Sequence, residues 1–256
     1  MIPIYIKLKR NNINQISTFK FLNWRNGYCY FKAIYLEKEV FVKIDTKMHL
    51  LSNDKLVYDL CKDEMKDDLV EILHYSIDGK IQFVAYEFFN SNELDETILL
   101  NKLKYIDDIL RILNNLSKLG IIHRDIKLNN FLVNGDKLKI IDFTFANSNA
   151  NNDFKEVDVN SSYNCFLLEF LGAGLNPSPF LWDDYYSFSS ILKSLKTKVE
   201  DSCKLKLHYY IKETEEFVGK TEYRLKCGTK YYFFIRKLKI RIKEIIRMDH
   251  DYRALQ

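Results

Sequence analysis

The sequence is poor in the residues that break regular structure or cross-link a chain. Only 8 glycines and 3 prolines occur among 256 residues, so long flexible linkers are not indicated. The five cysteines are widely spaced and form no C-x-x-C pair, which gives no sign of a disulfide framework or a zinc site. This cysteine usage is typical of a reducing compartment, and we expect a cytoplasmic protein.

Long apolar runs and a large charge of one sign are also missing. No uncharged apolar run approaches the length that spans a bilayer, and residues 1–7 alternate like a strand instead of forming the apolar core of a signal peptide. The net charge of +4 does not by itself indicate nucleic acid, and we expect no such partner. With 47% hydrophobic and 29% charged residues, the composition is that of a folded domain, long enough for two lobes.

Strand patterns dominate the first ninety residues and return once later. Asp78-Gly79 and Asn134-Gly135 are strong two-residue hairpin signals, each flanked by apolar and β-branched residues. We expect strands at about residues 28–36, 39–45, 69–77, 81–89, 131–133 and 137–141.

Helical spacing of apolar residues takes over after residue 90. One earlier helix is predicted to begin at Ser52 or Asn53, with Leu56 and Leu60 on its buried face. Gly120 follows a second apolar pattern, where the end of a helix favours glycine. The predicted helices span about 52–66, 100–119 and 182–195, and an Asn-rich exposed loop is expected at 147–160.

The segment from Ile121 to Leu132 concentrates polar residues with chemical potential. Five of them fall within eight positions: His123, Arg124, Asp125, Lys127 and Asn130. Asp142-Phe143-Thr144 follows behind the predicted hairpin. The two segments resemble the catalytic loop H-R-D-x-K-x-x-N and the metal-binding D-F-G motif of the protein kinases.

This resemblance implies a protein-kinase-like α+β fold. An antiparallel-sheet N-lobe is expected at residues 1–89 and a helical C-lobe at 90–256, with the active site in the cleft between them. The implied activity is transfer of the γ-phosphate of ATP to a hydroxyl group, with Mg²⁺ or Mn²⁺.

The resemblance also implies a role for each residue of the motif. Asp125 would orient the acceptor hydroxyl and take its proton, and Lys127 would place a positive charge near the γ-phosphate. Asn130 and Asp142 would hold the metal, because magnesium prefers oxygen ligands.

Three further residues are expected to support the catalytic loop. His123 and Arg124 would act as scaffold, and an arginine at this place can also pair with a phosphate on the neighbouring loop. Asp184 begins a segment similar to the D-x-W-S-x-G-x-x-L helix, whose aspartate would accept hydrogen bonds from the backbone of the loop.

The lysine that grips the α- and β-phosphates is expected on the predicted strand at 39–45. Val40-Phe41-Val42-Lys43 resembles the V-A-I-K strand, which assigns this role to Lys43. For its acidic partner, Asp59 fits the helix geometry best and Glu64 is second.

The other ATP contacts follow weaker patterns. Gly27 is the only glycine where a glycine-rich loop should lie, so that loop is degenerate. The run Val84 to Phe89 resembles the strand that leads to the hinge between lobes, where the backbone of Glu87 and Phe88 would hold adenine.

Three departures from the family pattern leave the acceptor open. Thr144 replaces the glycine of D-F-G, and residues 172–177 stand where an A-P-E motif would precede the Asp184 helix. Only about sixty residues follow that helix, which predicts a truncated C-lobe. Such a compact lobe is similar to that of the bacterial lipopolysaccharide-core heptose kinases.

The tail adds a second consideration about the acceptor. Residues 230–247 carry seven basic residues and one acid, with apolar residues at helical spacing. Two interpretations remain open: a basic amphipathic helix on an anionic membrane surface, or a helix packed on the C-lobe with a solvated basic face.

Together these patterns favour Ser or Thr of a protein as acceptor. The alternatives are a sugar kinase of the heptose kinase type at the inner membrane surface, and a pseudokinase that binds nucleotide without turnover. Against the last stands the presence together of Lys43, Asp125, Asn130 and Asp142.

Overall fold

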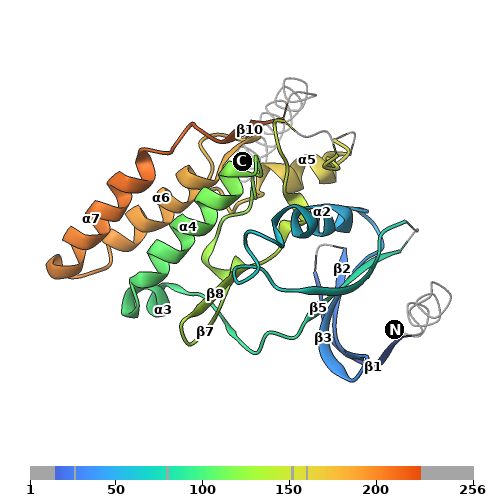
Figure 1. Ribbon diagram of the computed structural model, residues 1–256. Coiled ribbons are helices and arrows are strands. Elements are labelled where there is room, and N and C mark those ends of the chain that lie inside the picture. The colour runs from blue at the N-terminus through green and yellow to red at the C-terminus, as the bar shows by residue number, and fades with distance from the viewer. Residues whose placement is uncertain (1–14, 26, 79–80, 151–152, 160, 226–256) are drawn as a thin grey trace, which may run out of the picture.

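A five-stranded antiparallel sheet forms the first part of the chain (Figure 1). The structure is a computed structural model, and it describes residues 15–25, 27–78, 81–150, 153–159 and 161–225. Its order is β1-β2-β3-β5-β4. The strands are β1 (Ile16–Arg25), β2 (Tyr28–Tyr35), β3 (Lys38–Asp45), β4 (Ile72–Ser76) and β5 (Gln82–Glu87). The four strands predicted in this region are confirmed by β2 to β5, with bounds that differ by a few residues at β4 and β5.

Strand β3 lies at the centre of the sheet and presents two different faces. Val40, Val42 and Ile44 are completely buried in the core of the sheet. Because side chains alternate along a strand, Lys43 and Asp45 point to the opposite face. Both are buried there, Lys43 with 5% and Asp45 with 0% of its surface exposed. The sheet therefore carries a cation and an acid toward the rest of the molecule.

Helix α2 (Leu51–Cys61) follows β3 and covers that face. It begins one or two residues earlier than predicted and ends at Cys61 instead of about residue 66, because backbone turns replace the helix there. The predicted caps are wrong, since Leu50 occupies the cap position without a side-chain hydrogen bond and Asn53 lies inside the helix.

The start of α2 is fixed by Asp45 instead. Its Oδ1 accepts hydrogen bonds from the backbone nitrogens of Lys47 and Met48, both at 2.8 Å, and its Oδ2 accepts one from Leu50 at 3.0 Å. A buried carboxylate thus organises the turn that connects β3 to α2.

The second part of the chain is mainly helical (Figure 1). Helix α6 packs beside α7, and apolar residues of α4, α6, α7 and α2 share one large core. The helices are α3 (Glu96–Asn101), α4 (Lys104–Lys118), α5 (Ser162–Glu169), α6 (Asp184–Lys196) and α7 (Asp201–Glu215). The helix predicted at 100–119 begins at Lys104, because α3 and a short break precede it. The predicted helix at 182–195 corresponds to α6.

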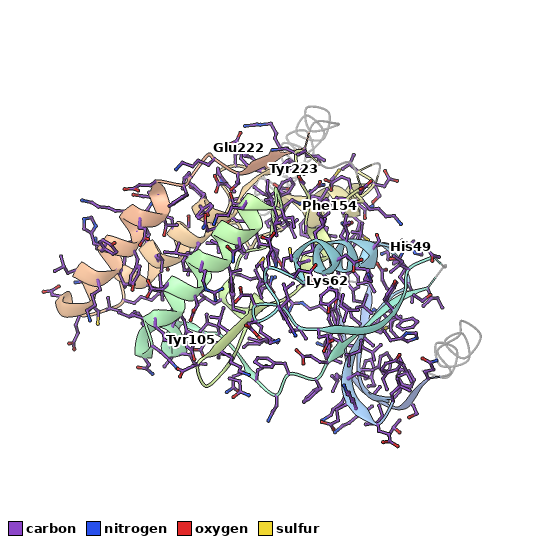
Figure 2. All side chains as sticks on the ribbon, viewed as in Figure 1. His49, Lys62, Tyr105, Phe154, Glu222 and Tyr223 are labelled. Carbon is purple, nitrogen blue, oxygen red and sulfur yellow. The ribbon has the colours of Figure 1, made fainter. Side chains whose placement is uncertain are left out.

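Short strands connect these helices. The strands β6 (Asn92–Glu93), β7 (Phe131–Asn134) and β8 (Lys137–Ile140) form one small sheet, and β9 (Leu181–Asp183) pairs with β10 (Glu222–Arg224). The predicted hairpin at Asn134-Gly135 is confirmed as the turn between β7 and β8. Tyr105, in the first turn of α4 (Figure 2), ties this turn to the helix by donating its hydroxyl proton to the Gly135 carbonyl at 2.5 Å.

The Asn-rich stretch at 147–160 is less exposed than predicted. Asn147, Ser148, Phe154 and Val157 are buried, so the prediction of an exposed loop is wrong for much of its described part. The expected strand at residues 1–7 and the basic tail at 230–247 lie outside the described residues. In the part that is described, no helix has the length and apolar character to cross a membrane.

Replacing Asp45 with alanine is expected to lower the free energy of unfolding by about 2–4 kcal/mol, because three backbone N–H groups lose a charged acceptor. Urea unfolding followed by circular dichroism measures the change. Asp63→Ala removes an exposed aspartate just beyond α2 and should change the same quantity by less than about 0.5 kcal/mol. Equal stability of Asp45→Ala and wild type would contradict the role of Asp45 at the start of α2.

Candidate active site

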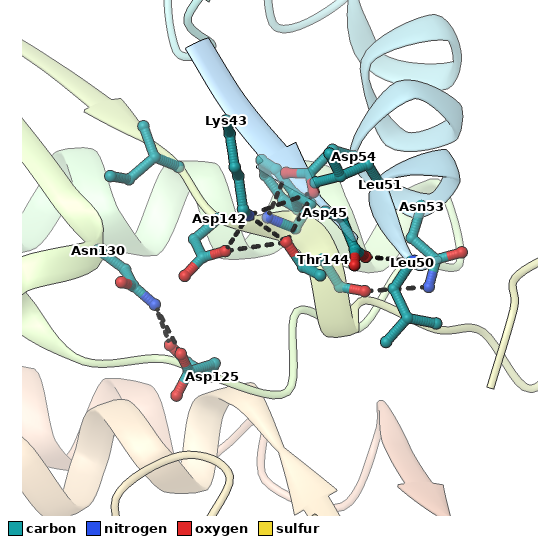
Figure 3. Close-up of polar contacts among 12 residues, drawn as sticks. Lys43, Asp45, Leu50, Leu51, Asn53, Asp54, Asp125, Asn130, Asp142 and Thr144 are labelled. Atoms are coloured by element: carbon teal, nitrogen blue, oxygen red, sulfur yellow. Dashed lines mark hydrogen bonds and ion pairs between the residues drawn. The ribbon is translucent and has the colours of Figure 1, made fainter. Parts of the chain in front are cut away.

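Lys43 is the centre of a buried polar cluster formed by three separate parts of the chain (Figure 3). Its Nζ donates to Asp142 Oδ1 at 2.7 Å and also contacts Thr144 Oγ1. The carboxylate of Asp54, from the first turn of α2, lies 3.5 Å from the same nitrogen. One cation from the sheet is thus surrounded by oxygens from α2 and from residues 142–144.

The predicted acidic partners of Lys43 are wrong. Asp59 lies on the exposed side of α2 and pairs with Lys55 one turn earlier, and Glu64 is exposed beyond the end of the helix. The error came from the phase of the helix: Leu60 is 42% exposed, whereas Asp54, Val57 and Cys61 share the buried face. The spacing of Asp54 with Val57 and Cys61 at i, i+3 and i+7 was the signal that identifies this face.

The charges of this cluster shift the pKa values of its members. Burial raises the pKa of the Asp54 carboxyl, although Lys43 opposes this effect. Burial also acts on Asp142, but there the ion pair with Lys43 outweighs it and holds the pKa well below its ordinary value. Lys43 keeps its charge despite burial, since the two aspartates raise its pKa. The main ion pair is therefore Lys43 with Asp142.

Asp125 is also buried. Its carboxylate accepts hydrogen bonds from three groups. Its Oδ2 accepts from Lys127 Nζ at 2.6 Å and from Asn130 Nδ2 at 3.0 Å. Its Oδ1 accepts from the backbone nitrogen of Gly172 at 3.0 Å. These contacts hold the carboxylate in one orientation, with Lys127 as a neutralising charge.

The contact with Gly172 was not foreseen from the sequence. Gly172 has a φ of +83°, and a Cβ there would lie 2.8 Å from the Asn176 side chain and 3.2 Å from the carbonyl oxygen of Arg124. Glycine is therefore required, both by the backbone angle and by the close approach to the catalytic loop. This glycine belongs to the segment that replaces A-P-E.

Asn130 and Asp142 have oxygens suited to a hard cation. The amide nitrogen of Asn130 is turned toward Asp125, where it also donates to the backbone oxygen at 2.8 Å, so its Oδ1 faces away. Asp142 uses Oδ1 for Lys43 and Thr144. The backbone joins the two residues, because Ile141 donates to the Asn130 carbonyl at 3.0 Å. Within the described residues, no group of three or more His, Cys, Asp or Glu forms a complete metal site.

Asp184, the first residue of α6, holds the backbone of the catalytic loop. Its two carboxylate oxygens accept from the backbone nitrogens of His123 and Arg124, at 2.7 and 3.0 Å. His123 lies against the ring of Phe143 and is within 2.9 Å of the Ile141 carbonyl through Nε2. Arg124 has a φ of 68° and Asp142 one of 69°, so both motifs place a non-glycine residue in the left-handed region.

The Arg124 side chain is buried in an aromatic pocket and faces a carboxylate. Its two terminal nitrogens contact Glu156 at 2.6 and 3.1 Å, and its guanidinium lies over the rings of Trp182 and Tyr223. Glu156 also accepts from Asn147 Nδ2 and the Tyr223 hydroxyl, both at 2.9 Å. Sequence reasoning considered a phosphate for this arginine and missed Glu156, which lies 32 residues away.

The remaining nucleotide-site candidates lie at the ends of strands of the five-stranded sheet. Gly27 connects β1 to β2 and has a φ of +88°. Strand β5 ends at Glu87, whose Oε1 pairs with Lys139 at 2.9 Å. The backbone nitrogens of Glu87 and Phe88 already donate to the carbonyls of Glu71 and Glu39. An adenine contact in this segment would therefore need its carbonyl groups or the residues that follow.

Replacing Glu156 with glutamine is expected to lower the free energy of unfolding by about 2–4 kcal/mol at neutral pH, because Arg124 stays buried without its counter-charge. Burial favours the neutral acid, but Arg124 outweighs it and lowers the pKa of Glu156 below its ordinary 4.5. The stabilisation by the Arg124–Glu156 pair is therefore complete above the pKa that Glu156 has in the unfolded chain. It declines as the pH falls through the lower pKa that Glu156 has in the folded protein.

Urea unfolding of wild type and Glu156→Gln from pH 7 to pH 3.5 measures this difference. We expect a constant difference down to about pH 5 and a smaller one below it. Glu93→Gln, an exposed residue in β6, is the matched control. A difference that grows on acidification would contradict the direction of the pKa shift.

Comparison with known proteins agrees with this geometry. The family model described as "Protein kinase domain" matches residues 32–165, just over half of the chain. A probable serine/threonine-protein kinase of Encephalitozoon cuniculi is 34% identical over 97 residues, which are 38% of this chain and 17% of that protein. The cell cycle protein kinase DBF2 of Candida albicans is 30% identical over 128 residues, 46% of this chain and 17% of that protein.

Among solved structures, the kinase PK-1 of the Cydia pomonella granulovirus is similar with a TM-score of 0.44 and 16% identity, over 57% of this chain and 60% of that one. The segment that matches each of the two curated relatives is about a sixth of that relative's length. The family match covers the catalytic loop, the D-F-T segment and β3. The chain belongs to the protein kinase domain family.

Proposed function

We propose that the chain transfers the γ-phosphate of ATP to a serine or threonine hydroxyl of a protein. The observation that carries this proposal is the relative position of two hydrogen-bonded pairs of polar side chains. Lys43 is paired with Asp142, Asn130 is paired with Asp125, and Asp142 lies between Lys43 and Asn130 (Figure 3). Phosphoryl transfer needs a cation on the phosphates, oxygen ligands for a metal and an acid beside the acceptor. The cluster contains all three.

Asp125 would act as the base. In the transfer, the acceptor oxygen forms a bond to the γ-phosphorus while the bond from that phosphorus to the β,γ-bridging oxygen breaks. The proton of the acceptor hydroxyl passes to Asp125, and the released ADP keeps the bridging oxygen. The hydrogen bonds from Asn130 and Gly172 would orient the carboxylate for this step. Lys127 would turn from Asp125 toward the γ-phosphate when ATP is bound.

The metal would be Mg²⁺ or Mn²⁺. Asn130 and Asp142 would hold it through Oδ1 and a carboxylate oxygen, and nucleotide phosphates would complete its coordination. When bound, the metal neutralises charge that develops on the phosphate oxygens. Lys43 would contact the α- and β-phosphates from the sheet. Gly27 and the segment at Glu87 and Phe88 would cover the phosphates and the adenine.

The residues that hold the catalytic loop are proposed to have a structural role. Asp184, His123 and Arg124 would keep the catalytic loop in place without touching substrate. We further propose that the lobes divide near residue 89, where β5 and its following segment end. For the basic tail at 230–247 both predictions stay open: contact with an anionic membrane surface, or packing on the C-lobe with a solvated basic face.

A protein acceptor is supported by two observations. The family model and both curated relatives named above are of protein kinases, the relatives being named as a serine/threonine-protein kinase and a cell cycle protein kinase. Lys127 in the catalytic loop is also the residue type expected for serine and threonine acceptors. A sugar acceptor and a pseudokinase are kept as outcomes of the experiment below.

Transfer of ³²P from γ-labelled ATP into a cell lysate tests the proposal, with Mg²⁺ or Mn²⁺ present and with protein and lipid–glycan fractions separated afterwards. We expect label in the protein fraction and a loss of about 10²- to 10⁴-fold in Asp125→Asn, because the base is removed. Asp67→Asn, which changes an exposed aspartate outside the polar cluster, is the control and should match wild type.

Other outcomes separate the alternatives. Label confined to the glycan fraction would indicate a sugar acceptor. Nucleotide binding with no label above the Asp125→Asn background would indicate a pseudokinase. Full activity of Asp125→Asn would contradict the role of Asp125.

A further inference from the structure

Thr144 stands where the family motif has glycine, yet it is completely buried and its hydroxyl lies among three charged groups. Its Oγ1 is 2.7 Å from Asp54 Oδ2 and 3.0 Å from Asp142 Oδ1, and it accepts from Lys43 Nζ (Figure 3). A residue chosen only to fill space would not need a hydroxyl at this position. Its neighbours therefore point to a polar function.

The distances show what the hydroxyl contributes. Lys43 Nζ reaches Asp142 directly at 2.7 Å, but its distance to Asp54 is 3.5 Å, the outer limit of a hydrogen bond. A hydroxyl can accept from an ammonium group and donate its own proton to a carboxylate at the same time. Thr144 does this between Lys43 and Asp54, and the shorter contact assigns its proton to Asp54 rather than Asp142.

The backbone at Thr144 accepts a residue other than glycine. Thr144 is not among the described residues with positive φ, so glycine is not required by the backbone angle here. Asn53 Nδ2 donates to the Thr144 carbonyl at 3.1 Å, and Asp54 Oδ1 accepts from the Phe143 nitrogen at 3.1 Å. Two consecutive residues of α2 thus hold the segment that carries Thr144, which fixes the hydroxyl beside Lys43.

We propose that Thr144 is a positioning residue whose hydroxyl links Asp54 to Lys43 and so fixes the lysine for the nucleotide phosphates. This inference rests on the function proposed above. Asp54 is a short acid, and the hydroxyl bridges the gap that its carboxylate leaves. Thr144 and Asp54 therefore work as one pair, and each loses most of its effect on Lys43 without the other.

Two substitutions separate the hydroxyl from the shape of the side chain. Thr144→Val keeps the branched shape and removes the hydroxyl, whereas Thr144→Ser keeps the hydroxyl and removes a methyl group. Loss of a buried hydrogen bond to charged groups is expected to raise KM for ATP and to lower kcat/KM by about 10- to 100-fold in Thr144→Val. Thr144→Ser is expected to stay within about threefold of wild type.

A double-mutant cycle provides a readout that does not depend on catalysis. The urea midpoint of unfolding is measured for wild type, Thr144→Val, Asp54→Asn and the double variant. If the hydroxyl and the carboxylate interact, the double variant loses less free energy of unfolding than the sum of the losses in the two single variants. Additive losses would overturn the proposal.

The two measurements also distinguish this inference from the proposed function. A coupled cycle in a protein without transfer activity would support the link between Thr144 and Asp54 and contradict the kinase activity. Normal transfer with equal effects of Thr144→Val and Thr144→Ser would support the activity and overturn the role of the hydroxyl.

Discussion

The structure depends on one constraint: the positive charge of Lys43 lies in the interior and must be neutralised there. Removing one partner of a buried ion pair costs about 3–5 kcal/mol, because the other charge is left without compensation. The partners of Lys43 come from α2, where Asp54 is 11 residues further along the chain, and from Asp142 and Thr144, which are 99 and 101 residues away. The fold must therefore bring the sheet, α2 and the D-F-T segment together before the lysine can be accommodated.

Helix α2 carries much of this requirement. Asp45 fixes the turn that starts it, Asn53 holds the backbone of the D-F-T segment and of Lys155, and Asp54 contributes a charge. On the far side, Asp184 and Gly172 hold the loop that presents Asp125. Both motifs of the family are thus supported by buried carboxylates that bind backbone N–H groups, which orient the site without being part of the proposed chemistry.

Sequence patterns predicted the parts of this arrangement that are local. The hairpins, β3 and the catalytic loop follow from turn residues, alternation and a motif confined to eight residues. The partner of Lys43 could not be assigned correctly, since an error in helix phase moved the buried face from Asp54 to Asp59. Glu156 and Gly172 escaped prediction because their contacts join residues 32 and 47 positions apart, which no local period encodes.

Calorimetric titration with a non-transferable ATP analogue tests the central claim most directly, namely that Lys43 and Asp142 form a site for a nucleotide and a metal. The analogue is titrated into wild type and Asp142→Asn, with Mg²⁺ and with EDTA. We expect Mg²⁺ to tighten binding to wild type at least tenfold and to have little effect on binding to Asp142→Asn. Equal dependence on Mg²⁺ in the two proteins, or no binding to wild type, would contradict it.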